Sequence, residues 1–187
     1  RNSRDENKKI KNGVIPEEWE KPENKSKLAQ KDIDADWTKK NGERHFGYKD
    51  HVKCDADSKL ITNYSVTSAS VHDSQRCLVF IGQEDEVLYA DSAYSGKPIA
   101  LALPENCKNQ ICEKGYRNSP LTSEQKMNNR RKSRIRCRIE HIFGFMTGAM
   151  HGITIRSIGI TRAWMNIGIT NLVYNFCRYS YLKRASA

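Results

Sequence analysis

Two acidic residues of this chain stand where carboxylates can do chemistry. Asp91 ends the apolar run EVLYAD and is followed by small residues and Gly96, whereas Glu140 lies in the basic stretch RRKSRIRCRIEHIFGF. They are 140 − 91 = 49 positions apart, and a mixed α/β core can bring a carboxylate at a strand end against one on a helix. Hard oxygen ligands hold Mg²⁺, and two such ions about 4 Å apart suit phosphodiester chemistry. A paired metal-binding site is therefore one hypothesis.

Both carboxylates also have structural interpretations. Asp91 is the kind of residue that caps a helix following a strand. Glu140 can form an exposed ion pair with Arg136, worth a few tenths of a kcal/mol, although the basic residue stands on the less favourable N-terminal side. His141 suits helix packing or a DNA contact better than a metal-ligand role.

Charge is the strongest compositional signal. The 187 residues include 32 Lys plus Arg against 22 Asp plus Glu, a net charge of +10, which favours a polyanionic partner such as nucleic acid. The basic helix provides four candidate phosphate contacts, namely Lys132, Arg134, Arg136 and Arg138. The alternative for each is a solvated helix face.

Other features narrow the class of protein. Six cysteines show no C-x-x-C spacing, so neither a zinc ribbon nor a disulfide framework is indicated. No apolar run is long enough to cross a membrane, and the first residues lack the hydrophobic core of a signal peptide. We therefore expect a cytoplasmic protein without a membrane partner.

The chain divides by composition into three parts. Residues 1–36 are polar and contain Pro16 and Pro22, which predicts a largely irregular arm or insertion; residues 37–182 form an α/β domain, and 183–187 form a tail. Within the domain we expect a β-hairpin over 45–55 and 59–70, a short helix over 71–81, a central strand over 86–91, a helix over 97–103 and a strand over 109–114.

Two long helices complete the prediction. Thr122 and Gln125 make a capping box for a helix over 123–146. Its apolar stripe comprises Ile135, Ile139, Ile142, Phe143 and Met146. A second helix over 161–182 is expected to turn inward Trp164, Ile167, Leu172, Val173 and Phe176.

Several segments together resemble the DDE transposases of bacterial insertion sequences, in particular the insertion-sequence-five group. They are WTKKNGERHFGYKDHVKCDADSKLI, SASVHDSQ, YADSAYSG, RRKSRIRCRIEHIFGFMTGAM and RSIGITRAWMNIGITNLVYNFCRY. The resemblance covers nearly the whole chain. It implies a ribonuclease H-like mixed sheet flanked by helices, and DNA strand cleavage and strand transfer that depend on two Mg²⁺ or Mn²⁺ ions.

The resemblance also implies residue roles. The family's G/A-D-x-x-Y-x-G motif is matched by Asp91, Tyr94 and Gly96, and its R-x-x-x-E-H-x-F motif by the segment from Arg136 to Phe143. Asp91 and Glu140 would then be catalytic residues and metal ligands. Implied partners are double-stranded DNA at the transposon ends and target, and a second copy of the chain in a synaptic homodimer at the bacterial nucleoid.

One departure from the family pattern concerns the first catalytic aspartate. In the family it lies on the first strand, ahead of the segment with which this sequence begins, and no Asp here occupies that position. We therefore expect the sheet to lack its first strand and this chain alone to be unable to cleave DNA. Two alternatives stay open, a non-catalytic DNA-binding remnant of a transposon and another ribonuclease H-like nuclease.

Overall fold

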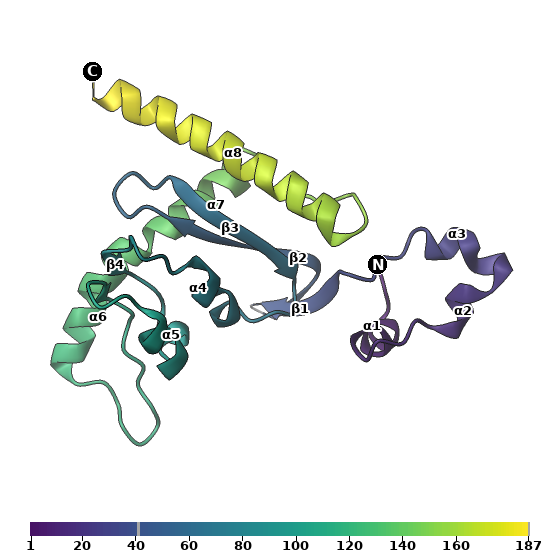
Figure 1. Cartoon of the computed structure of the whole chain (residues 1–187), viewed down its shortest axis with the longest axis horizontal. Coiled ribbons are helices and arrows are strands. Elements are labelled where there is room, and N and C mark those ends of the chain that lie inside the picture. Colours follow the sequence, from purple (N-terminus) through teal and green to yellow (C-terminus); the bar gives the residue numbers. More distant parts are fainter. Residues whose placement is uncertain (41, 187) are drawn as a thin grey trace. The chain divides into compact units, whose positions relative to one another are not determined.

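A computed structural model describes residues 1–40 and 42–186 (Figure 1). The elements follow in the order α1 (Arg4–Lys11), α2 (Glu17–Glu20), η1 (Pro22–Asn24), α3 (Lys25–Leu28), β1 (Asp36–Lys40), β2 (Glu43–Cys54), β3 (Ile61–Ser68), α4 (Ser74–Phe80), β4 (Val87–Leu88), η2 (Ser92–Tyr94), α5 (Lys97–Ala102), β5 (Lys108–Asn109), α6 (Ser123–Arg136), α7 (Arg138–Gly148) and α8 (Ile160–Ala185). The chain is thus a mixed α/β protein. None of these helices is long and apolar enough to cross a membrane.

The chain forms two compact units. One contains residues 1–51, 65–71 and 153–171, and the other contains 52–64, 72–152 and 172–187. The described strands pair in two sheets, β1-β2-β3 and the two-stranded parallel β4-β5. The mixed α/β class is confirmed, but the strands do not join in the single mixed sheet that we expected.

The predicted β-hairpin is confirmed as β2 and β3. Its turn closes where the Asp55 carboxylate accepts a hydrogen bond from the Ser58 backbone N–H at 2.7 Å and Asp55 N–H donates to the Leu60 carbonyl. On the other side, β1 pairs antiparallel with β2, with Trp37 opposite Phe46 and their ring centroids 5.2 Å apart. Aromatic pairs of this kind stabilise neighbouring strands.

The first 36 residues are more ordered than the sequence suggested, because one carboxylate organises them. Ser3 and Glu6 form a capping box at the start of α1, and the Glu6 carboxylate also accepts hydrogen bonds from Trp19 Nε1 at 3.0 Å and Lys31 Nζ at 2.9 Å. Trp19 is only 4% exposed. The prediction of a largely irregular segment was wrong, since polar contacts across the segment take the place of a large apolar core.

The strand predicted over 86–91 is short and is not central. β4 spans two residues, Val87 is 37% exposed, and the strand pairs only with β5 among the described residues. Strand-like hydrogen bonds nevertheless continue from Gln110 N to Leu88 O and from Cys112 N to Ala90 O. The side chains of Leu88, Tyr89 and Ala90 are half-buried, so the run is not buried on both faces as a central strand would be.

The long basic helix is confirmed with one interruption. Its capping box at Thr122 forms as predicted, but the helix divides into α6 and α7 at Cys137, whose Sγ donates to the Arg134 carbonyl. Ile142 and Met146 of the predicted stripe are 0% and 1% exposed. The helix therefore packs its apolar face as expected.

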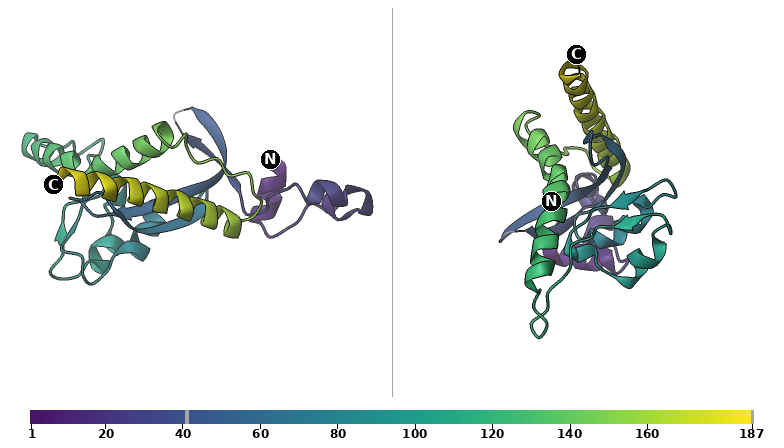
Figure 2. Two further views of the ribbon diagram at one scale, coloured as in Figure 1. Left: turned by 90° about the horizontal axis from the view of Figure 1, so that it is seen from above. Right: turned by 90° about the vertical axis from the view of Figure 1, so that its left-hand side faces the viewer.

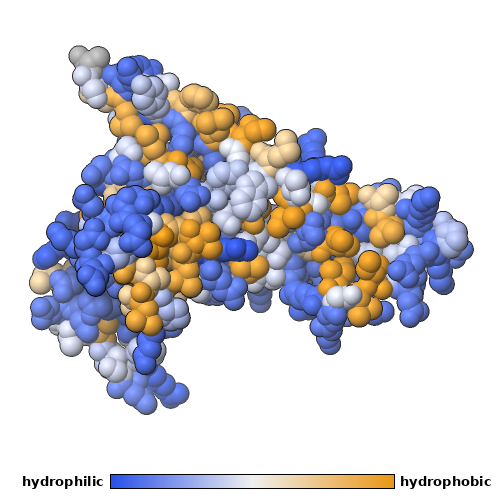
Figure 3. Space-filling model, in the orientation of Figure 1, coloured by the Kyte–Doolittle hydropathy of each residue, from blue (hydrophilic) through white to orange (hydrophobic). Residues whose placement is uncertain are grey.

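The last helix, α8, runs unbroken over 26 residues (Figure 2), but its predicted core face was largely wrong. Of the five inward-facing candidates only Ile167 is buried, at 3% exposure, whereas Phe176 is 62% exposed. The buried positions are Ala163, Ile167, Asn171 and Tyr174. These positions recur at helical spacing, and the asparagines on this side of α8 hydrogen-bond to strands of the sheet. The larger apolar side chains therefore gather on the surface of α8 (Figure 3).

Candidate catalytic site

Asp91 stands at the strand end as the sequence suggested. It is the exposed N-cap of η2, and its Oδ1 accepts hydrogen bonds from the Ser92 backbone N–H at 2.5 Å and the Ser92 hydroxyl at 3.2 Å. The capping interpretation is therefore confirmed. Within the described chain the second oxygen, Oδ2, accepts no hydrogen bond, so capping leaves Asp91 a free ligand atom.

A small apolar core holds this strand end in place. Cys77, Ile99 and Ile111 form the cluster, and Ala90 and Tyr94 pack against it on either side of Asp91. Burial, reinforced by the negative charges of Asp73 and Asp91, raises the pKa of Tyr94 to about 12. The Tyr94 phenol is consequently neutral at physiological pH and is held close enough to Asp91 to sense its charge.

The segment 111–113 joins the strand end to the basic helix. Cys112 N donates to the carbonyl of Ala90, and on its other side Asn129 of α6 pairs both its amide groups with the Glu113 backbone at 2.9 Å. Lys132 of α6 donates to the Ile111 carbonyl, also at 2.9 Å. Segment 111–113 is thus fastened both to the strand end that carries Asp91 and to α6, the helix directly before the one that carries Glu140.

Glu140 lies in the first turn of α7, about two helical turns beyond Lys132. Its side chain is 61% exposed, and Oε1 lies 3.1 Å from Nη2 of Arg136, with which it forms an ion pair. The ion-pair interpretation is therefore confirmed as well. A side chain this exposed can exchange its arginine partner for another cation at little cost.

The four predicted phosphate contacts have different surroundings. The Lys132 side chain is 16% exposed, and its amine donates to the Ile111 carbonyl. Arg138 donates to the Ala56 carbonyl and to Asp57, and Arg136 pairs with Glu140. Of the four, Arg134 alone forms no side-chain hydrogen bond or ion pair within the described residues, and it is exposed. Lys132 and Arg138 therefore join distant segments of the chain, which the sequence spacing alone did not reveal.

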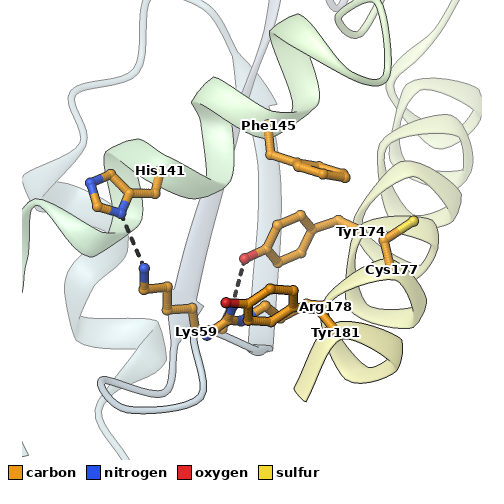
Figure 4. A pocket seen from close by; sticks show the side chains of 7 residues that line it. All are labelled: Lys59, His141, Phe145, Tyr174, Cys177, Arg178 and Tyr181. Atoms are coloured by element: carbon orange, nitrogen blue, oxygen red, sulfur yellow. Dashed lines mark hydrogen bonds between the residues drawn. The ribbon is translucent and has the colours of Figure 1, made fainter. Parts of the chain in front are cut away.

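Sequence reasoning missed one feature, a pocket of about 230 Å³ in the same unit (Figure 4). It is lined by Lys59, His141, Phe145, Tyr174, Cys177, Arg178 and Tyr181. These residues come from the hairpin turn, α7 and α8. Because they are far apart in sequence, no local motif predicts that they form a pocket. The only indication in the sequence was that some of these residues are basic.

Comparison with known proteins places the chain in a family. Residues 16–176 match the family described as the transposase DDE domain. The chain belongs to this family. Over 117 residues it is 33% identical to the transposase for insertion sequence element IS1106 of Neisseria meningitidis serogroup B, an alignment that covers 61% of this chain and 40% of that relative. The chain thus spans less than half the length of this relative, and no solved structure matches it closely.

Members of the transposase DDE family bind DNA and generally use divalent metal ions, and the donor chemistry here agrees in kind. Asp91 and Glu140 each offer an exposed carboxylate oxygen, the ligand that Mg²⁺ prefers. Among residues 1–40 and 42–186, however, no three His, Cys, Asp or Glu side chains gather as a metal-binding group. The two carboxylates thus match the metal by ligand type, and no group of three such side chains surrounds them in the described part of the chain.

Proposed function

We propose that this chain is part of the catalytic domain of an insertion-sequence transposase of the insertion-sequence-five group, with a ribonuclease H-like arrangement of its elements. The protein would cleave double-stranded DNA at transposon ends and transfer the strand to a target, acting as a homodimer in the bacterial cytoplasm. The observation that carries the proposal is that Asp91 and Glu140, both within the family match, stand exposed in the same compact unit, Asp91 beside segment 111–113 and Glu140 on the helix that follows α6.

Each residue has a role in this proposal. Asp91 Oδ2 and the Glu140 carboxylate would hold two Mg²⁺ or Mn²⁺ ions, and Ser92 would fix the Asp91 rotamer through Oδ1. When bound, such ions lower the cost of charge on the attacking and leaving oxygens of a phosphodiester. The exposed Arg134 would contact a DNA phosphate, positioning the strand without reading its sequence.

We further propose that cleavage needs a carboxylate beyond this pair, since no third ligand gathers among the described residues. The 187-residue chain with Mn²⁺ should then leave supercoiled plasmid DNA intact. Metal-dependent nicking that Asp91→Ala abolishes would contradict this part of the proposal.

DNA affinity distinguishes the enzyme from a simple DNA-binding remnant. Fluorescence anisotropy with a labelled duplex should show a component of affinity that requires Mg²⁺ and disappears in Glu140→Gln, whereas Glu124→Gln, an exposed residue at the start of α6, should keep it. A remnant that only binds DNA should depend on salt and be indifferent to both substitutions. That second pattern would remove the catalytic interpretation.

A further inference from the structure

The pocket in Figure 4 is cationic and aromatic. Lys59 and Arg178 carry positive charge into it, and Phe145, Tyr174 and Tyr181 supply aromatic rings. None of the seven lining residues is acidic. An anion entering this pocket would therefore meet no carboxylate among the residues that line it, in a protein of net charge +10.

Lys59 holds an unusual backbone conformation at the edge of this pocket. Its φ is +60°, in the left-handed region that a glycine or asparagine adopts more easily. The turn holds it there, because Lys59 N–H donates to the Asp55 carbonyl and the Tyr174 hydroxyl donates to the Lys59 carbonyl at 3.0 Å. The result aims the lysine amine at His141, with Nζ 3.1 Å from Nδ1 (Figure 4).

Beside Lys59, Arg178 lies against an exposed ring. Its guanidinium carbon is 5.0 Å from the centroid of Tyr181, which is 56% exposed. Arg178 Nε donates to the Ser58 carbonyl at 2.7 Å, and no hydrogen bond within the described chain occupies the two terminal nitrogens. A phosphate could accept from those nitrogens while an unpaired base stacks on the tyrosine.

The pocket is also tied to the helix of Glu140. His141 follows Glu140 directly, and Arg138 fixes the hairpin turn to α7 by donating to the Ala56 carbonyl and Asp57. A ligand here would lie against the same helix that carries the proposed catalytic carboxylate. We propose that the pocket binds one phosphate of a DNA strand between Lys59 and Arg178, with an adjacent unpaired base stacked on Tyr181.

This inference rests on the proposed function only in taking DNA as the ligand, and matched substitutions on α8 test it. The probe is a fluorescent oligothymidylate in low salt without divalent metal, measured by anisotropy. Arg178→Gln should weaken binding about fivefold or more, and Arg184→Gln, which removes the same charge from an exposed position outside the pocket, less than about twofold.

The tyrosines offer a second matched pair. Tyr181→Leu should weaken binding about fivefold or more, because a stacked base is lost. Tyr179→Leu should change it less than about twofold, although Tyr179 is 52% exposed and has Lys183 over its ring. Equal effects of pocket and control substitutions in both pairs would overturn the inference.

Lys59→Gly separates binding from folding. Glycine relieves the left-handed conformation, so the melting temperature should rise while oligonucleotide affinity falls. Unchanged affinity in this variant would count against the pocket. The assay contains no metal and so does not depend on the proposed metal ligands. Pocket variants with unchanged affinity would therefore refute the pocket alone, and a duplex affinity that does not depend on metal would refute the proposed catalytic function alone.

Discussion

The Glu140 carboxylate lies 3.1 Å from a terminal nitrogen of Arg136, one helical turn earlier and on the other side of the break at Cys137. The arginine thus occupies the acidic side chain that we propose as a metal ligand. Since Glu140 is 61% exposed, this pair adds little to stability and acts chiefly as competition for a cation.

Arg136→Gln is therefore expected to raise Mn²⁺ affinity about two- to threefold at low ionic strength, because a positive charge beside the ligand is removed. Calorimetric titration measures the change, and the free energy of unfolding should move by less than about 0.5 kcal/mol. Arg134→Gln is the control, since Arg134 contacts no carboxylate among the described residues. Lower Mn²⁺ affinity in Arg136→Gln would contradict this role.

Glu6 predicts acid sensitivity in the first helices. Burial alone would raise its pKa, but hydrogen bonds from the Ser3 backbone, Lys31 and Trp19 outweigh it and lower the pKa from 4.5 to about 2. This stabilisation is present above pH 4.5 and is lost as the pH falls toward 2. Glu6→Gln should cost on the order of 2 kcal/mol at pH 7 and almost nothing at pH 2, measured by urea unfolding with the fluorescence of the buried Trp19.

The exposed Glu18 provides the control for that experiment. Glu18→Gln should change the free energy of unfolding by less than about 0.5 kcal/mol at either pH. An effect of Glu6→Gln that does not depend on pH would contradict the ionic origin of the stabilisation.

Asp50 predicts the opposite pH dependence. Burial raises its pKa to about 6, and although Asn171 Nδ2 donates to it at 3.3 Å, Asp50 Oδ2 and Asn171 Oδ1 both lack a hydrogen-bond partner. The raised folded pKa means that stability is highest below pH 4 and falls as the pH rises to about 6.

Asp50→Asn should remove this dependence and stabilise the protein at pH 7 by on the order of 2 kcal/mol, since an amide supplies a donor and carries no charge. Urea unfolding across pH 4 to 7 tests it. Glu124→Gln is the control, and its free energy of unfolding should depend on pH as that of the unmodified chain does. A pH slope that survives Asp50→Asn would assign the dependence to another group.

The exposed side of α8 and the buried side of α7 predict unequal effects of shortening an apolar side chain. Phe176→Ser, at a position 62% exposed, should change the free energy of unfolding by less than about 0.5 kcal/mol. Ile142→Ala, at a fully buried position of α7, should cost about 3 kcal/mol. Thermal or urea unfolding measures both, and a large loss in Phe176→Ser would mean that this face is covered in solution.

How far the sequence predicted the fold depended on whether local contacts or distant ones decide each element. Turn and cap chemistry is local, so the hairpin turn at Asp55 and the capping box at Thr122 were predictable. The inward face of α8 was not, because Asn175 pairs with both backbone groups of Ile61 at 2.8 Å and so helps set the orientation of the helix. Apolar periodicity carries no signal for such a polar anchor.

The candidate site shows the same division. Asp91 and Glu140 could be located from motifs because each sits at a recognisable place, a strand end and a basic helix. The sequence could not predict that the Lys132 side chain points inward, because the Ile111 carbonyl to which it donates lies 21 positions away. The pocket residues Lys59 and Arg178 meet only once the hairpin and α8 have packed together.

Mn²⁺ binding, followed by electron paramagnetic resonance of the free ion, tests directly whether Asp91 and Glu140 share one metal site. The four proteins are the unmodified chain, Asp91→Asn, Glu140→Gln and the double variant. If the two carboxylates share one metal site, each single substitution lowers affinity about tenfold or more, and the double variant loses clearly less than the sum of the single losses in free energy. Strictly additive losses, or an affinity unchanged by either single substitution, would contradict a shared site.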